Sequence, residues 1–227
     1  MILSLAAVGL APSLGSGRNN STGVPVDEDV AEASPTPEGL PTFESPQDTI
    51  DIGRGYTATI TTDQGPIVLE LDTANAPETA NSFAFLAGQN YYDGQEFFWV
   101  IPGFDAQAGD PTCVDNEEFS CSGVGGPGYT LAKEGEGAPG GQWAVIAPVT
   151  VAGGDQVHGS QFVIAMSEDG DFEGTVIGLV SEGQEILQSL GERRPCFGTQ
   201  TPDAGGCQAE DDLAQPLTIE DVVVQPA

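Results

Sequence analysis

The chain contains one histidine, His158, and a histidine beside a hydroxyl and a carboxylate is the arrangement that hydrolases use for nucleophilic catalysis. Ser160 lies two residues further along, but no nucleophile-elbow motif surrounds it. The sequence therefore does not predict a hydrolase triad. We expect His158 to be a polar residue of a loop.

Two further segments resemble ligand-binding loops only in part. Residues 123–128 match G-x-G-x-x-G, but a dinucleotide site needs a helix after this pattern, and Tyr129-Thr130-Leu131 predicts a strand. Residues 169–174 begin like an EF-hand loop, but Val180 stands where calcium binding requires a glutamate. We therefore expect no cofactor and no dedicated metal site, although so acidic a protein offers oxygen ligands for adventitious calcium.

The four cysteines form two close pairs, eight and eleven residues apart. Neither pair has C-x-x-C spacing, and a single histidine leaves no zinc-binding set. Four cysteines allow three pairings, of which the spacing favours two local disulfides. These join Cys113 with Cys121 and Cys196 with Cys207. Disulfides persist in oxidising compartments, so we expect an extracytoplasmic protein.

The charge of the chain excludes some classes of partner. It has 35 acidic and 5 basic residues and a formal net charge of −30. Binding to nucleic acid needs clustered lysine and arginine, and binding to anionic membranes is disfavoured for the same reason. The acidic residues are most simply a solvated coat that keeps the protein soluble.

The N-terminal residues differ in composition from the rest. The first eleven residues are almost entirely apolar, which is the length of a signal-peptide core and too short for a membrane span. We expect residues 1–17 to be a signal peptide or a truncated membrane anchor. Residues 18–51 are rich in proline and acid and have no hydrophobic periodicity, which predicts a disordered spacer. Residues 52–227 then form the folded domain.

Short β-rich runs separated by glycine-rich loops dominate this domain. Asp63-Gln64-Gly65 predicts a hairpin turn between two of them. Pro77 suits the first turn of a helix, and Gly88 is expected to end it. A second helix is expected at 184–190. The predicted strands cover 56–62, 66–71, 97–101, 143–147, 162–166, 175–180 and 219–224. Many strands with two helices suggest a closed barrel.

One segment carries a specific family resemblance. Residues 97–110 read F-F-W-V-I-P-G-F-D-A-Q-A-G-D, which resembles the cyclophilin signature F-H-R-V-I-P-G-F-M-x-Q-G-G-D. Further segments resemble the family in the same order, at 65–71, 76–83, 123–126, 159–164 and 172–180. The resemblance implies a mostly β fold, a closed eight-stranded antiparallel barrel capped by two α-helices. It also implies cis–trans isomerisation of X-Pro peptide bonds in proline-containing peptides or proteins.

Several site residues follow from this resemblance position by position. Phe104 matches the aromatic residue on the floor of the proline pocket, and Gln107 matches the polar group beside the catalytic arginine. Val163 takes the place of a second pocket phenylalanine. The remaining substrate-binding positions are Gly123 and Gln161, on the rim and wall, and Phe172.

The sequence also departs from the family at this site. Trp99 stands at the arginine position, Asp105 replaces a pocket methionine, and Asp171 replaces an aromatic residue. We therefore expect weakened isomerase activity. The alternative is a non-catalytic domain that binds peptides or has a structural role in an extracellular assembly with an unidentified partner. Arg193 or Arg194 would have to reach the site to replace the missing cation.

Overall fold

The structure of the chain, a computed structural model, describes residues 41–114, 121–135, 141–152, 155–170, 172–197, 200, 202 and 206–227. The expected signal peptide or anchor at 1–17, the spacer as far as residue 40, and Asp171 lie outside the described residues.

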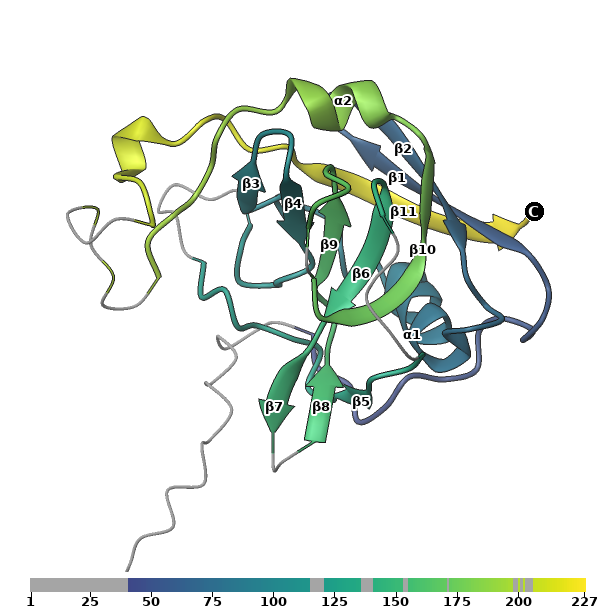
Figure 1. Ribbon diagram of the computed structural model, residues 1–227. Coiled ribbons are helices and arrows are strands. Elements are labelled where there is room, and N and C mark those ends of the chain that lie inside the picture. Colours follow the sequence, from purple (N-terminus) through teal and green to yellow (C-terminus); the bar gives the residue numbers. More distant parts are fainter. Residues whose placement is uncertain are drawn as a thin grey trace, which may run out of the picture. The chain divides into compact units, whose positions relative to one another are not determined.

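An eight-stranded antiparallel sheet forms the body of the domain (Figure 1). Its strands pair in the order β11-β1-β2-β10-β6-β9-β4-β3. In chain order they are β1 (Tyr56–Thr62), β2 (Gly65–Leu71), β3 (Trp99–Ile101), β4 (Asp105–Ala108), β6 (Ala144–Pro148), β9 (Phe162–Ala165), β10 (Gly174–Glu182) and β11 (Ile219–Pro226). The predicted strands therefore all form.

The two edges of this curled sheet meet without a regular ladder. The segment just before β3 pairs with the start of β11 through a single bridge between Glu96 and Thr218. The amide of Phe97 donates to the carbonyl of Leu217 at 2.9 Å, and that of Ile219 donates to the carbonyl of Gln95 at 2.8 Å. The sheet expected to form a closed barrel is therefore closed, between the segment before β3 and the start of β11, by only a few backbone hydrogen bonds.

Alternating side chains place the core inside the curl. In β1 every second residue is buried, as the period of a strand requires. A smaller three-stranded sheet contains β5 (Leu131–Ala132), β7 (Thr150–Ala152) and β8 (Asp155–His158), and a 3-10 helix covers Glu210–Asp212. The largest fully buried side chains include Ile60, Ile67, Leu69, Phe97, Phe162 and Ile164.

Two helices lie at opposite ends of the sheet (Figure 1): α1 (Pro77–Gly88) and α2 (Gln184–Ser189). The first begins at Pro77 and ends at Gly88, as predicted. Its N-cap residue, Ala76, has no side-chain acceptor. The carboxylate of Glu134 supplies one instead, because it accepts the backbone N–H groups of Glu78 at 3.1 Å and Thr79 at 2.7 Å.

The described end of the expected spacer packs against the domain. The ring of Phe43 lies 5.1 Å from that of Phe85, and its amide donates to the carbonyl of Pro127 at 2.8 Å. Further along, the side-chain oxygen of Asn81 accepts the amide of Thr49 at 2.7 Å. The prediction of a spacer without packed contacts is therefore wrong for 41–51, because Phe43 and Ile50 supply apolar contacts that a compositional average hides.

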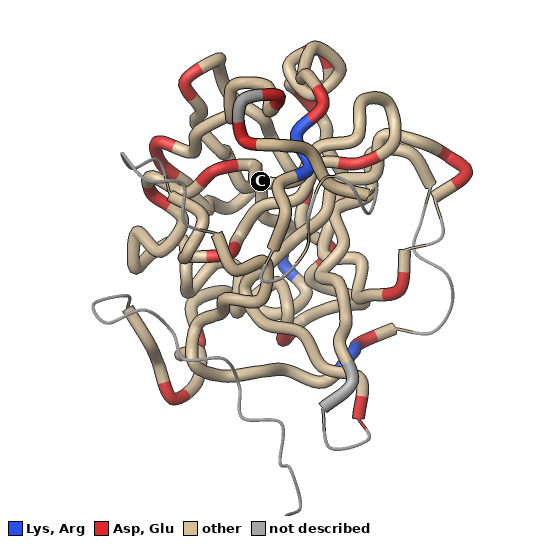
Figure 2. Tube along the Cα trace, turned by 90° about the vertical axis from the view of Figure 1, so that its left-hand side faces the viewer, with Lys and Arg blue, Asp and Glu red and all other residues tan. Residues whose placement is uncertain are grey.

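Both expected disulfides are present, Cys113–Cys121 and Cys196–Cys207. Such bonds are typical of oxidising compartments. Within the part of the chain that the structure describes, no helix is long and apolar enough to cross a membrane. Figure 2 shows acidic residues spread over many loops and strand ends, with lysine and arginine at few positions.

Candidate functional site

The candidate site lies on the outward face of β3, β4 and β9. Trp99 is opposite Gln107 in the β3–β4 ladder, and Gln107 is opposite Val163 in the β4–β9 ladder. Directly opposed residues of an antiparallel pair lie on the same face. The next residues along, Val100, Ala106 and Ile164, all belong to the core. Trp99, Gln107 and Val163 therefore form one row on the face of the sheet opposite to these core residues, and Val163 is itself buried.

Two glutamine side chains connect this row to the glycine-rich loop. The amide nitrogen of Gln107 donates to the side-chain oxygen of Gln161 at 2.7 Å. The amide of Gln161 donates in turn to the carbonyls of Gly123 at 3.2 Å and Gly125 at 3.0 Å. Three positions predicted from the resemblance, Gln107, Gln161 and Gly123, thus lie together.

Aromatic side chains border the same face at the β3–β4 turn. Phe104 is one of the exposed large apolar residues, with 36% of its surface accessible. Its ring lies 5.4 Å from the ring of Phe172, which comes from the segment before β10. The structure therefore brings these two predicted substrate-binding residues together.

Asp105 is a buried carboxyl group on this outward face. It lies opposite Ile101 and Ala165 in the two ladders, and 8% of its surface is accessible. Its Oδ1 atom has no hydrogen-bond partner. Burial raises its pKa to about 6, against a smaller opposing effect of the hydrogen bond from the Ile101 backbone. About half of the Asp105 carboxyl groups are therefore protonated, and so uncharged, near pH 6.

Trp99 packs against a residue that sequence reasoning missed. Its indole stacks on the ring of Phe197, with centroids 6.2 Å apart and an interplanar angle of 25°. Phe197 follows Cys196 directly, in the loop that the second disulfide closes. Only its position in a cysteine-bracketed loop marked this aromatic residue in the sequence.

Neither arginine considered from the sequence lies free beside Trp99. Arg193 is buried and forms a 2.7 Å ion pair with Glu96, and it also donates to the carbonyl of Ala214. Arg194 pairs with Glu192 and donates to the carbonyl of Gly206. Both guanidinium groups are therefore engaged with carboxylates of their own, Glu96 and Glu192.

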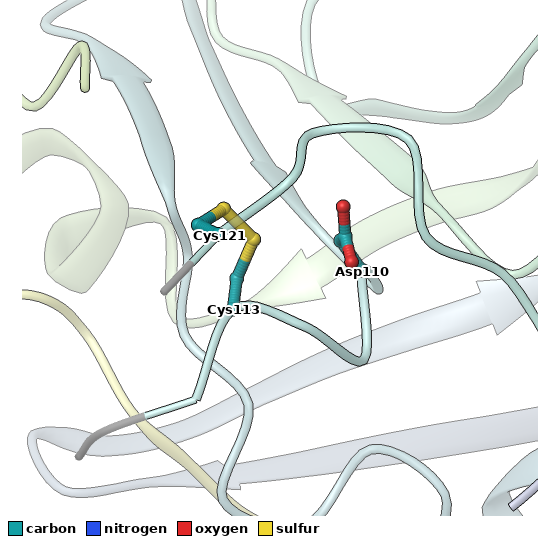
Figure 3. Close-up of side chains that lie close together, drawn as sticks. All are labelled: Asp110, Cys113 and Cys121. Carbon is teal, nitrogen blue, oxygen red and sulfur yellow. A yellow bond between two sulfur atoms is a disulfide. The ribbon is translucent and has the colours of Figure 1, made fainter. Parts of the chain in front are cut away.

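Asp110, Cys113 and Cys121 lie close together in the manner of a metal site (Figure 3). The two cysteines form a disulfide and so offer no thiolate. The carboxylate of Asp110 accepts the amides of Thr112 at 2.8 Å and Gly125 at 2.9 Å, and it also accepts two hydroxyl groups. Asp110 therefore holds the glycine-rich loop in place, and this group does not have the character of a metal centre.

The prediction that His158 lies in a loop is wrong, because His158 is the last residue of strand β8. It is buried, and its Nε2 atom lies 3.2 Å from the hydroxyl of Thr79. Burial lowers its pKa. Ser160 donates instead to the carbonyl of Gly109 at 2.7 Å. The correction arises because pairing with β5 draws the segment into the small sheet, which local composition does not reveal.

Comparison with known proteins assigns the fold and the family. The sequence profile of the cyclophilin type peptidyl-prolyl cis-trans isomerase/CLD family matches residues 57–223. Peptidyl-prolyl cis-trans isomerase B of Bacillus subtilis is 38% identical over 130 residues, covering 56% of this chain and 85% of the relative. A peptidyl-prolyl cis-trans isomerase of Helicobacter pylori is 34% identical over 137 residues, covering 59% and 78%.

Solved structures agree on the fold. The crystal structure of a cyclophilin type peptidyl-prolyl cis-trans isomerase of Cryptosporidium parvum has a TM-score of 0.58 and 22% identity, covering 76% of this chain and 99% of the other. A second structure of that protein, in the presence of the dipeptide Ala-Pro, has a TM-score of 0.56, 22% identity and coverages of 75% and 99%. The matched profile spans most of the domain from β1 to β11. The chain belongs to the cyclophilin-type peptidyl-prolyl cis-trans isomerase family.

Proposed function

We propose that this domain binds X-Pro segments of extracytoplasmic proteins on the face of β3, β4 and β9, and isomerises them with reduced turnover. The observation that carries the proposal is the Gln107–Gln161 hydrogen bond, which ties the row to the glycine-rich loop at one end of β4, while Phe104 lies at the other end. The similar Cryptosporidium parvum structure, determined in the presence of Ala-Pro, supports a proline-containing ligand. The two disulfides support an oxidising compartment.

The chemistry of isomerisation sets what such a site must supply. Amide resonance gives the peptide bond a rotation barrier of about 18–20 kcal/mol. An isomerase lowers it by binding the twisted amide better than either planar form. The proline ring needs apolar contacts, which Phe104, Phe172 and Val163 offer. The prolyl nitrogen needs a hydrogen-bond donor once resonance is lost.

The donor is the weak part of this site. Trp99 stands where the family resemblance places an arginine, and an indole offers one N–H group and no charge. A hydrogen bond to a charged group contributes about 1.5–3 kcal/mol. Its loss therefore costs roughly ten- to a hundredfold in rate. On this basis we expect turnover to be present but low.

A second function has its own support. Arg193 and Arg194 are committed to Glu96 and Glu192. A site without a cation still holds a proline segment through its apolar and amide groups. The domain would then be a non-catalytic peptide-binding or structural module of an extracellular assembly.

A titration with a proline peptide distinguishes three cases: an isomerase, a non-catalytic peptide-binding module, and a domain without proline-specific binding. We expect amide shifts of Gln107, Gln161 and Phe104 when a blocked Ala-Pro peptide is added to labelled protein, and no shifts with the Ala-Ala counterpart. Exchange between the cis and trans peptide signals would identify the isomerase. Binding without faster exchange would identify the non-catalytic module. Equal response to both peptides would contradict the proposal.

A further inference from the structure

The segment just before Cys196 lies along the outer edge of β3. Arg193 exchanges two backbone hydrogen bonds with Val100, of 2.7 and 3.0 Å, so this segment runs antiparallel to β3. The buried ion pair between Arg193 and Glu96 fixes that contact. Figure 1 shows the chain after α2 passing the outer side of β3. The geometry thus carries Phe197 to Trp99.

Phe197 contacts the site from two sides. It stacks on Trp99, and its ring lies 6.0 Å from that of Phe98. A side chain added at Gly123 would come within 3.2 Å of the same ring. Phe197 therefore spans the space between β3 and the loop whose carbonyls accept from Gln161. Each of the two loops is anchored by its own disulfide.

The surface made by these side chains is apolar and partly open. Trp99 and Phe197 are each only half-buried, and Val124 beside Gly123 is 65% exposed. We name Trp99, Phe197 and Val124 the aromatic wall. None of the three carries a charge, which sets the wall apart in a chain of net charge −30.

We propose that the aromatic wall binds a large apolar or aromatic side chain of the substrate, a few residues away from the proline. The inference rests on the proposed function, because it extends the same face. Its central residue is Phe197, which determines specificity and holds Trp99 in position. Stacking suits an aromatic guest, and the acidity of the protein disfavours substrates with acidic residues at this position.

The distance along the face sets where that side chain lies. Trp99 is two strand spacings from Val163, about 10 Å, and the ring centroid of Phe197 lies 6.2 Å from that of the indole. An extended peptide advances about 3.3–3.6 Å per residue. The wall is therefore reached about three to five residues from the proline. Peptides used as probes need at least five residues on each side.

The test measures selectivity by the fluorescence of Trp99. The chain has two tryptophans, so Trp143→Phe leaves Trp99 as the only indole. Blocked undecapeptides with a central proline would carry Phe, Ala or Glu at the third, fourth and fifth residues on either side. We expect tighter binding of the Phe peptides than of the Ala peptides by about three- to tenfold, and weakest binding of the Glu peptides.

Phe197→Ala should remove the preference, so that the Phe and Ala peptides bind this variant with equal affinity. It should also shift Trp99 emission to longer wavelength, and Phe197→Leu should restore part of the preference. Phe43→Ala is the matched control, since Phe43 is equally half-buried but packs on Phe85 and Tyr91. A preference for Phe peptides over Ala peptides that survives in Phe197→Ala would overturn this inference and leave the proposed function standing. Failure of every proline peptide to bind would overturn the proposed function with it.

Discussion

Trp99 and Gln107 are opposed across β3 and β4, and the same glutamine donates to Gln161, so the indole is one strand away from the amide pair of the site. The row places an uncharged donor where the family resemblance expects a guanidinium. It is also tied to the glycine-rich loop, because Gln107 donates to Gln161 and Gln161 donates to backbone carbonyls of that loop.

The first prediction concerns the carboxyl group of Asp105. Its folded pKa of about 6 exceeds its ordinary value of 3.8, so the folded state holds this proton more tightly than the unfolded chain. Below about pH 4 the group is neutral in both states and costs nothing. Stability is lost as pH rises from about 4 to 6, by about 2–3 kcal/mol, and the loss persists above pH 6.

Asp105→Asn removes this titration. We expect the variant to be more stable than the wild type at pH 8 by about 1–3 kcal/mol in denaturant unfolding, with the difference shrinking toward pH 4. Asp169→Asn is the control, because Asp169 is exposed, and its difference from wild type should not follow this curve. A pH-independent difference for Asp105→Asn would contradict the buried, unpartnered carboxyl.

The second prediction concerns the cap of α1. Glu134 lies 55 residues from Thr79 in the chain, yet its carboxylate accepts two N–H groups of the first helical turn. We expect Glu134→Ala to lower the free energy of unfolding by about 1–2 kcal/mol, as the loss of a helix cap does. Glu182→Ala, at an exposed position ending β10, should change it by less than about 0.5 kcal/mol. Equal effects of the two substitutions would argue against the cap.

The third prediction concerns the segment 41–51. The amide of Phe43 is bonded to Pro127 and its ring packs on Phe85, so this amide should exchange slowly with solvent deuterium. Phe43→Ala should speed exchange over 43–50 and destabilise the domain by about 1–2 kcal/mol. Ile52→Ala, at a side chain that is 70% exposed, should do neither. Fast exchange at Phe43 in the wild type would restore the expectation of a free spacer.

Most of the fold was predictable because its signals are local. The alternation in β1, the proline at the start of α1 and the glycine at its end each act within a few residues, and the close cysteine pairs favoured the correct disulfides. The resemblance also placed Gln107, Gln161 and Gly123 near one another, where the structure joins them.

The features that were missed all depend on contacts between distant segments. Phe197 reaches Trp99 only because Arg193, which follows α2 in the chain, pairs with Val100 of β3. His158 is buried because its segment pairs with β5, and Phe43 is ordered by rings more than forty residues away. A single sequence carries the composition of such segments, but it does not carry their pairing.

The central claim is that this site binds an X-Pro segment and isomerises its prolyl peptide bond without the arginine that the family resemblance implies. The direct measurement is the cis–trans exchange rate of a proline peptide at saturating enzyme, for the wild type, Trp99→Arg and Trp99→Ala. Trp99→Arg would also be measured with Asp105→Asn, so that the carboxylate cannot hold the new guanidinium. We predict low wild-type turnover, a rise of about ten- to a hundredfold in Trp99→Arg, and no rise in Trp99→Ala. Wild-type turnover that Trp99→Arg fails to exceed, in either background, would contradict the account.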